Sequence, residues 1–350
     1  MASVTVQEIK GQHLAWSDVL DNYYSTHMDV FKFIDSSSHS DLALIGCGTS
    51  FYLSLSAAST YTGITGLPAR AVTASDVLLY SNTLFPRGRS YLGIPISRSG
   101  KTTETVRAAK YVKNELKMET IALTCTPHSE LVKLATRSLL AEKAMEKSVV
   151  MTQSFTSMLL VIQLMAAARS KNEAFREDLM KLPECGKRII SDFETLAVEI
   201  AEHPEIDCFT YLGQGPYYGL ACESMLKMKE MSLSVSEAYH SMEYRHGPIS
   251  ILNKGTLVVF LMSESGREQE IKILEEVKEL GGKTLVICER ANGSITKSSD
   301  YLLELNSKVG DFARLVLYMP VIQLLGYYRA IRKGLNPDNP KNLTQVVVLE

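Results

Sequence analysis

A loop rich in hydroxyl groups and cations follows an apolar run, since residues 97–103 read SRSGKTT. A glycine-containing turn between a strand and a helix presents free backbone N–H groups and the positive end of the helix dipole. Hydroxyl donors and cations complete an anion site at such a turn, so this loop is predicted to bind a phosphate. The alternative is that its Ser and Thr side chains only cap the following helix.

A second segment with chemically active side chains, residues 221–251, reads ACESMLKMKEMSLSVSEAYHSMEYRHGPISI. On a helix, Glu223, Lys227 and Glu230 stand at i, i+4 and i+7 and therefore share one face. His246 precedes a Gly-Pro pair that fixes a sharp bend, and an exposed loop histidine titrates near neutrality. The alternatives to an acid–base site are a solvated, salt-bridged helix face and an ordinary surface histidine.

The elements that must position these groups occur twice. Gly46 and Gly213, each in a G-x-G after an apolar run, are 167 residues apart. Ser97 and Ser263, each the first residue of an S-x-S-G, are 166 residues apart. A nearly constant offset indicates two copies of one α/β unit, which favours phosphate binding over simple capping in the first loop. The second loop reads SESGREQE, and its three carboxylates are expected to occupy or repel an anion site.

Composition excludes several functional classes. The chain has 350 residues, 45% hydrophobic and 22% charged, with a net charge of −2, which suits two ordinary domains and gives no reason to expect nucleic acid. The sequence has no evident signal peptide, membrane-length apolar run or C-x-x-C spacing, so we expect a cytoplasmic protein with reduced thiols and no membrane partner. Its histidines form no metal-binding pattern, so no metal is expected. The dinucleotide-binding pattern G-x-G-x-x-G is not completed at Gly46–Phe51, so no other cofactor is expected either.

Alternating strand and helix patterns predict an α/β fold with two tandem doubly wound parallel-sheet domains. We expect an N-terminal helical segment (1–35), a phosphate-binding domain (36–170), a helical linker (171–205) and a second domain (206–350) that contains the Glu–Lys–Glu helix, the histidine loop and the C-terminal tail. The predicted strands are Leu42–Gly46, Ala69–Val72, Tyr91–Ile96, Thr120–Thr124, Ser138–Leu140, Cys208–Leu212, Thr256–Met262 and Thr284–Cys288. Pro95 weakens the third, because proline cannot donate to a ladder. Predicted helices include residues 5–35, Thr103–Leu116, Ser129–Ala135, Thr152–Arg169 and Asn172–His203.

Four motifs in order resemble the sugar-isomerase (SIS) family: GCGTS, SRSGKTTET, the ESMLKMKE–YRHGPI segment and the terminal NPDNPKNLTQVVVLE. The similarity runs from about residue 25 to residue 350 and is greatest to the isomerase half of glucosamine-6-phosphate synthase and to stand-alone glucosamine-6-phosphate deaminases. The resemblance implies two SIS domains, a sugar-phosphate substrate and a homodimer with active sites shared between subunits.

The resemblance also implies roles for individual residues. Glu230 matches the glutamate that moves a proton between C1 and C2 of the open sugar, and Lys227 matches a lysine beside it. His246 matches the histidine that opens the sugar ring and reaches in from the neighbouring subunit. Val149 matches a backbone contact to the substrate. The implied sugar-phosphate site comprises Thr49, Ser50, Ser97, Arg98, Ser99 and Thr102.

Three departures from the family pattern bear on which reaction to expect. Arg98 stands where the family often has glutamine, and an arginine can still grip phosphate with an added charge. Gln345, at the implied substrate site, replaces the lysine with which the synthase forms a Schiff base, a role that an amide cannot fill. The chain begins MAS with no preceding glutaminase domain, so it is not expected to draw ammonia from glutamine.

The last two departures are consistent with the reaction running in reverse. An amino sugar already carries nitrogen at C2, so it supplies its own imine and needs no lysine. The predicted reaction is therefore isomerising deamination of an amino-sugar phosphate, with glucosamine 6-phosphate giving fructose 6-phosphate and ammonia. The alternatives are a deglycase for a ketosamine 6-phosphate, plain aldose–ketose isomerisation, and a non-catalytic sugar-phosphate sensor. The presence of both Glu230 and His246 stands against the sensor.

Overall fold

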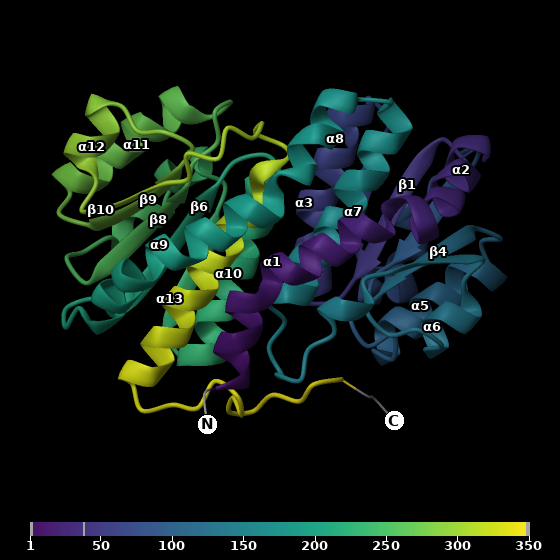
Figure 1. The fold of residues 1–350 in the computed structure, drawn as a ribbon, viewed down its shortest axis with the longest axis horizontal. Helices are drawn as coiled ribbons and strands as arrows, with labels where there is room; N and C mark the ends of the chain where they lie inside the picture. Colours follow the sequence, from purple (N-terminus) through teal and green to yellow (C-terminus); the bar gives the residue numbers. More distant parts are fainter. Residues whose placement is uncertain (1–2, 38, 348–350) are drawn as a thin grey trace. The chain divides into compact units, whose positions relative to one another are not determined.

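The computed structural model describes residues 3–37 and 39–347, and Figure 1 shows their fold. The chain divides into two compact units. The first unit consists mainly of residues 11–147 and 151–183 together with the tail from Thr344, and the second consists mainly of residues 184–343 together with 148–150. Each unit contains one five-stranded parallel sheet, which confirms the predicted fold class. The four-part division of the chain stays a prediction.

The first sheet has the strand order β2-β1-β3-β4-β5. Its strands are β1 (Asp41–Gly46), β2 (Ala69–Thr73), β3 (Tyr91–Pro95), β4 (Glu119–Thr124) and β5 (Arg137–Leu140), each within one residue of its predicted bounds. Strands β1 and β3 are buried along their whole length, as unbroken apolar runs in a sheet covered on both faces should be. Pro95 ends β3, and the ladder to β4 resumes at the bridge between Ile96 and Leu123, because proline has no N–H to donate.

The helices and 3₁₀ turn of the first unit are α3 (Thr49–Thr65), α4 (Ala74–Leu84), α5 (Thr103–Asn114), α6 (Glu130–Leu134), η2 (Glu142–Ala144), α7 (Gln153–Ser170) and α8 (Glu173–Met180). Helix α7 is buried on all sides from Gln153 to Ala167 and packs against α3. The predicted helix over residues 5–35 is interrupted. It consists of α1 (Val4–Asn22), a π-helical turn η1 (Tyr23–His27) and α2 (Met28–Ser36). Likewise, the predicted helix Asn172–His203 is two helices, α8 and α9 (Leu182–Glu202).

The second sheet has the order β10-β9-β8-β6-β7, which repeats the topology of the first when β6 is equated with β1. Its strands are β6 (Cys208–Gly213), β7 (Val235–Tyr239), β8 (Thr256–Leu261), β9 (Lys283–Cys288) and β10 (Tyr301–Glu304). The three predicted strands are within one residue of these bounds. The sequence pattern missed β7 and β10, which are edge strands with mostly half-buried residues. Edge strands β2 and β5 of the first sheet are no more buried, so exposure alone does not explain the two misses.

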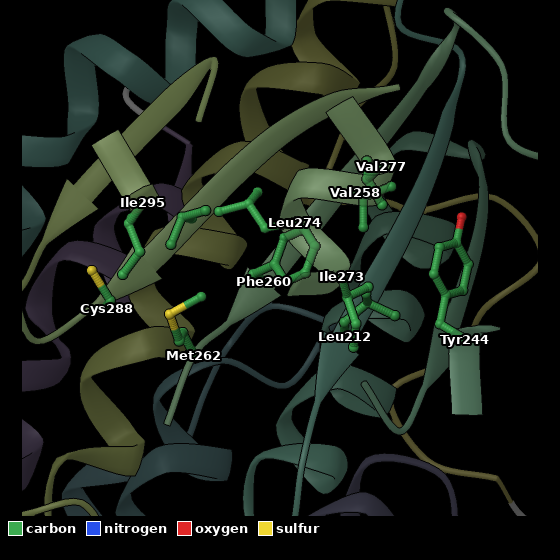
Figure 2. Packing of buried hydrophobic residues seen from close by; sticks show 11 residues of the cluster. Leu212, Tyr244, Val258, Phe260, Met262, Ile273, Leu274, Val277, Cys288 and Ile295 are labelled. Carbon is green, nitrogen blue, oxygen red and sulfur yellow. The ribbon is translucent and has the colours of Figure 1, made fainter. Parts of the chain in front are cut away.

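Helices cover both faces of the second sheet. Ile273, Leu274 and Val277 of α11 (Arg267–Glu279) pack on Val258 and Phe260, and Figure 2 shows this core with Tyr244 at its edge. On the opposite side of the sheet lie α10 (Tyr217–Ser232) and α13 (Tyr318–Arg332), which pack against each other (Figure 1). The shorter elements are α12 (Gly293–Ser298) and the 3₁₀ turns η3 (Met242–Arg245), η4 (Pro248–Ile251) and η5 (Arg314–Leu317).

Three general features bear on chemistry. All six cysteines are free thiols. Within residues 3–37 and 39–347, no helix combines the length and the apolar character that crossing a bilayer requires. Over the same ranges, no group of three or more His, Cys, Asp or Glu side chains is arranged to hold a metal ion.

Candidate active site

The S-x-S-G loop of the first unit joins β3 to α5 at the carboxyl edge of the sheet. Its first residue, Ser97, is tied to the neighbouring strand, because its N–H donates to Leu123 O at 3.1 Å. Gly100 has φ +62°, and a Cβ there would lie 2.2 Å from Ser129 Oγ. Glycine satisfies both the left-handed backbone and the close approach. The turn is therefore shaped by packing as well as by its own sequence.

Three hydroxyl groups of this loop interact with its own backbone or with each other. Ser97 Oγ lies 3.0 Å from Thr102 Oγ1 and accepts the Gly100 N–H at 3.1 Å. Ser99 Oγ accepts the Lys101 N–H at 3.2 Å. Thr102 is the N-cap residue of α5, yet its side chain makes no capping hydrogen bond. Helix capping therefore does not account for this hydroxyl, which stands beside the positive end of α5.

The G-x-G loop after β1 brings Thr49 and Ser50 to the same edge of the sheet, because β1 pairs directly with β3. Both residues begin α3 and are buried. A Cβ at Gly46 would lie 2.6 Å from the Ser50 carbonyl carbon, and Gly48 has φ +51°. Two glycines thus let the chain turn tightly from strand to helix. The residues gathered at the carboxyl ends of these two strands are Thr49, Ser50, Ser97, Ser99 and Thr102.

Arg98 is only 5% exposed, and protein groups bind its guanidinium. Nη1 pairs with Glu146 Oε2 at 3.0 Å, and Nη2 donates to the Gln345 carbonyl at 3.0 Å. Glu146 is 2% exposed and also accepts the hydroxyls of Thr152 at 2.8 Å and Ser154 at 2.5 Å. A buried carboxylate needs such donors and a balancing cation. This geometry favours Arg98 as the structural partner of Glu146 over the phosphate contact that the resemblance implies.

The C-terminal tail lies against this loop through the residues that depart from the family pattern. Arg98 and Gln345 contact each other directly, and Gln345 Nε2 donates to Glu146 O at 3.0 Å. The Thr103 N–H, at the start of α5, donates to Val347 O at 3.3 Å. Glu146 is the centre of these contacts, and sequence reasoning missed it. A single glutamate in AEKAMEKS carries no local signal of burial.

In the second unit, Glu223, Lys227 and Glu230 share one face of α10, but this face is not solvated. The Lys227 and Glu223 side chains are both 0% exposed, with charged atoms 3.2 Å apart, and Lys227 also pairs with Glu230, which keeps 18% exposure. A Cβ at Gly326 of α13 would lie 3.5 Å from Lys227 O, so α13 packs against the backbone of α10 at this position. The alternative of a solvated helix face is wrong for the buried pair.

Electrostatics keep Lys227 charged. Burial alone would lower its pKa, but the neighbouring carboxylates of Glu223 and Glu230 outweigh this effect, and the net pKa is raised. The result is an ammonium held between two carboxylates, of which Glu230 is the one that reaches solvent. A carboxylate at a solvent-accessible position and fixed by a permanent cation is suited to transfer a proton to and from a bound molecule.

His246 lies in the loop after β7, between η3 and η4. Tyr244, 1% exposed, anchors this loop in the second core (Figure 2), and Arg245 forms a bidentate pair with Glu276 at 2.6 and 2.7 Å. His246 itself is exposed, and its ring has no hydrogen-bond partner among the described residues. Gly247 follows with φ +121°. The loop therefore presents an accessible imidazole on a firmly anchored backbone.

The corresponding serine loop of the second unit, residues 263–266, is occupied by a carboxylate from elsewhere in the chain. Asp311 accepts the Glu264 N–H at 3.0 Å, the Ser265 N–H at 3.3 Å and the Ser265 hydroxyl at 3.2 Å. Arg314 Nη2 donates to the same carboxylate at 2.8 Å. Asp311 thus fills the place of an anion. It lies 47 residues after Glu264, and no local pattern marks it.

Glu270, one of the carboxylates in the second loop's sequence, also turns inward. It is 1% exposed and accepts the Ser241 hydroxyl at 2.6 Å and the Ser263 N–H at 3.2 Å. Burial raises the pKa of its carboxyl to about 7. These contacts confirm the expectation that carboxylates occupy the second loop, and they add Asp311 as an occupant that the expectation did not include.

The predicted site residues fall in both units. The first unit holds Thr49, Ser50, Ser97, Arg98, Ser99, Thr102 and Gln345, and the second holds Lys227, Glu230, His246 and Val149. Val149 lies half-buried in the segment 148–150. The structure therefore assembles hydroxyl groups at one sheet edge of the first unit, and an acidic–basic row plus an exposed imidazole in the second.

Known proteins share this architecture. The glutamine–fructose-6-phosphate aminotransferase [isomerizing] of Methanothermobacter thermautotrophicus is 28% identical over 310 residues, which are 88% of this chain and 52% of that protein. The chain thus spans about half the length of the curated relatives it matches. The crystal structure of glucosamine-6-phosphate deaminase from Thermotoga maritima is 29% identical with a TM-score of 0.79, covering 99% of this chain and 100% of that one.

A sugar-phosphate isomerase of known structure and a family model also match this chain. Tagatose-6-phosphate ketose/aldose isomerase from Escherichia coli has a TM-score of 0.88 at 20% identity, covering 100% of this chain and 96% of that one, and shows the same fold. The model of the SIS domain matches residues 36–168 and again residues 209–325, one match for each parallel sheet. The chain belongs to the SIS-domain family, with two SIS domains in tandem.

Proposed function

We propose that this protein catalyses the isomerising deamination of an amino-sugar phosphate, converting glucosamine 6-phosphate to fructose 6-phosphate and ammonia. The observation that carries the proposal is the row Glu223–Lys227–Glu230, in which a buried ammonium fixes a partly exposed carboxylate. Burying such charges is costly. A sensor that only binds a sugar phosphate has no need of them, whereas a proton-transferring enzyme does.

The proposed acid–base steps use His246 and Glu230. His246 opens the sugar ring by moving a proton between the C1 hydroxyl and the ring oxygen. Glu230 takes the proton from C2, which leaves an enolamine, and returns it to C1, which gives a ketimine at C2. Water adds to the ketimine and ammonia leaves, so the sugar product is fructose 6-phosphate. Glu230 is a carboxylate before it takes the C2 proton, a carboxylic acid while the enolamine exists, and a carboxylate again once C1 has been protonated. The Lys227 ammonium is its ion-pair partner in the carboxylate form.

The proposed phosphate site is the hydroxyl-rich edge of the first sheet. Ser97, Ser99 and Thr102 supply hydroxyl groups beside the N-terminus of α5, whose dipole favours an anion. Thr49 and Ser50 begin α3 at the same edge. In this proposal Arg98 stabilises the loop through its ion pair with Glu146 and does not contact the phosphate.

The choice of deamination over amine transfer rests on Gln345. A primary amine is required for a Schiff base with a ketose, and the Gln345 amide, bonded to Glu146 O, offers none. An amino-sugar substrate carries its own nitrogen, so release of ammonia requires no Schiff-base lysine. The similarity to the Thermotoga maritima deaminase, at 29% identity over 99% of this chain, supports the same choice.

We also propose a homodimer in which His246 serves the active site of the neighbouring subunit. Its exposed ring, without a hydrogen-bond partner in the described residues, is consistent with this role. Mixing inactive Glu230→Gln subunits with inactive His246→Ala subunits should restore about a quarter to a half of the activity, because some sites regain both groups. No recovery despite proven subunit exchange would place His246 in the site of its own subunit.

An ammonia-release assay over a panel of hexosamine and ketosamine 6-phosphates tests the reaction. Glucosamine 6-phosphate should release ammonia and yield fructose 6-phosphate in equal amounts. Release of amine only from a ketosamine 6-phosphate such as fructose-lysine 6-phosphate would establish a deglycase. Interconversion of sugar phosphates without nitrogen chemistry would establish a plain isomerase, and binding without turnover of any compound would establish a sensor.

A further inference from the structure

Beside the phosphate loop, the first unit contains an open pocket of about 730 Å³ that the proposed reaction does not use. Its walls come from Lys101 of the phosphate loop, from the first two turns of α5, from α6 and from the loop between β4 and α6. This volume lies in the range of small-molecule binding sites.

The pocket is lined by an excess of cations. Lys101, Arg107, His128 and Lys133 all contribute to its wall, against the one carboxylate of Glu130. The four basic side chains are exposed, and none has a hydrogen-bond or ion-pair partner within residues 3–37 and 39–347. Basic side chains gathered around one concavity focus a positive potential into it, which attracts anions.

A second observation, independent of the charges, is an unsatisfied hydroxyl in the pocket wall. Ser129 is 3% exposed and lines the pocket, and its Oγ has no hydrogen-bond partner in the described residues. Ser129 is the N-cap residue of α6, where a serine normally accepts a backbone N–H, but its side chain makes no such bond. Buried polar atoms are rarely left unpaired, and this hydroxyl lies against the S-x-S-G turn, since a Cβ at Gly100 would approach it to 2.2 Å. The unpaired donor therefore lies where the pocket wall meets the phosphate loop.

The frame of the pocket is hydrogen-bonded to the phosphate loop. The Leu131 N–H donates to Gly100 O at 3.1 Å, and the Arg98 carbonyl accepts the Cys125 N–H at 3.1 Å and the Thr124 hydroxyl at 3.0 Å. These bonds tie the loop before α6 to the S-x-S-G loop. Anything bound in the pocket therefore contacts the outer side of the element that is proposed to hold the substrate phosphate.

We propose that this pocket is a second anion site that binds a phosphorylated small molecule. Lys101, Arg107 and Lys133 supply three permanent charges against Glu130, which suits a phosphate monoester or a diphosphate group. Arginine and lysine around one pocket provide both directed donors and point charges for phosphate oxygens. The site is distinct from the hydroxyl groups of Ser97, Ser99 and Thr102, and it does not depend on the proposed reaction.

Calorimetric titration with inorganic phosphate and with diphosphate tests the proposal. The titrated protein carries Ser99→Ala and Thr102→Ala, so that the phosphate loop is disabled. One anion per chain should bind, more weakly as salt is added, and Arg107→Gln with Lys133→Gln should weaken binding at least tenfold. Lys110→Gln with Lys117→Gln is the matched control, because it removes two exposed cations from α5 and its end that do not line the pocket.

Three results would overturn the proposal. They are absence of binding by either anion at low ionic strength, binding that Arg107→Gln with Lys133→Gln leaves unchanged, and equal weakening in the control variant. Preference between the two probes separates a monoester site from a diphosphate site. Circular dichroism checks the fold, and if the double variant unfolds, each single substitution must still weaken binding at least threefold.

Discussion

The two serine loops occupy equivalent places in sheets of the same strand order, yet they hold different groups. In the first unit the loop's hydroxyls, such as Ser97 and Thr102, bond to each other and to the loop's own backbone. In the second unit Asp311 takes the N–H groups of Glu264 and Ser265, so a carboxylate of the protein stands where an anion would bind. Repetition has copied the framework, and a single side chain from outside the loop has closed one of the two sites.

The helices that follow the first strand of each sheet, α3 and α10, also differ, because only α10 carries a row of charged residues. With the 167-residue offset between Gly46 and Gly213, the row Glu223, Lys227 and Glu230 of α10 corresponds to Ser56, Thr60 and Gly63 of α3. There the Thr60 hydroxyl merely donates to Ser56 O at 2.8 Å. The first unit thus combines a hydroxyl-rich loop with an uncharged helix row, and the second combines the charged helix row with a loop that Asp311 fills. Under the proposed function, phosphate binding belongs to the first copy and proton transfer to the second.

The sharpest test of this division is Glu230→Gln. The amide keeps the size of the side chain but cannot accept the C2 proton, so kcat should fall by about 10²–10⁴ while KM changes little. Glu202→Gln, at an exposed position at the end of α9, is the control and should leave kcat and KM unchanged. In deuterated water the wild-type product should carry deuterium at C1. The amount of deuterium is reduced where Glu230 returns the original C2 proton to C1 before it exchanges with solvent. A near-normal kcat for Glu230→Gln would return the Glu–Lys–Glu row to a purely structural role.

Arg98→Gln tests whether the arginine of the first loop is structural. It leaves the Glu146 carboxylate buried without its cation and should cost about 3–5 kcal/mol of unfolding free energy in urea denaturation. Adding Glu146→Gln should recover most of that loss, because no uncompensated charge remains. A large rise in KM with unchanged stability would instead make Arg98 a phosphate ligand.

Paired alanine substitutions compare the two loops directly. Ser99→Ala with Thr102→Ala removes two donors to a charged acceptor, each worth roughly 1.5–3 kcal/mol, so KM should rise at least tenfold. Ser263→Ala with Ser265→Ala makes the same change in the loop that Asp311 fills, and KM should stay nearly constant. Steady-state kinetics with circular dichroism as a check on the fold measure both. Equal effects from the two pairs would remove the distinction between the copies.

The filled loop should also have a pH signature. The pKa of Glu270 is raised from 4.5 to about 7 in the folded protein, so this group favours folding when protonated, and its contribution is lost as pH rises through that range. Wild type should therefore lose about 2 kcal/mol relative to Glu270→Gln between pH 5 and pH 7, with no further change above pH 8. Urea unfolding curves of both proteins measure this difference. A constant difference across the range would mean that Glu270 is ionised in the folded state.

Most of the framework was predictable from the sequence. The interior parallel strands are buried on both faces and therefore read as unbroken apolar runs, which is why their bounds agree within one residue. The missed strands β7 and β10 are partly exposed edge strands. The edge strands β2 and β5 are equally exposed and were predicted, so burial does not separate the predicted edge strands from the missed ones. The π turn at Tyr23–His27 was also missed. The buried His27 ring bonds Leu140 O at 3.0 Å, a contact 113 residues away that no local pattern contains.

By itself, the sequence determined the two copies, the positions of both serine loops, and the helix face shared by Glu223, Lys227 and Glu230, because spacing and residue type are local properties. The tertiary structure decided which charged groups are buried and what they contact. It buried the Lys227 ammonium, paired Arg98 with Glu146, and placed the Asp311 carboxylate in the second loop. The state of an ionisable group depends on its burial and on partners brought from distant parts of the chain. Those are set only when the elements pack.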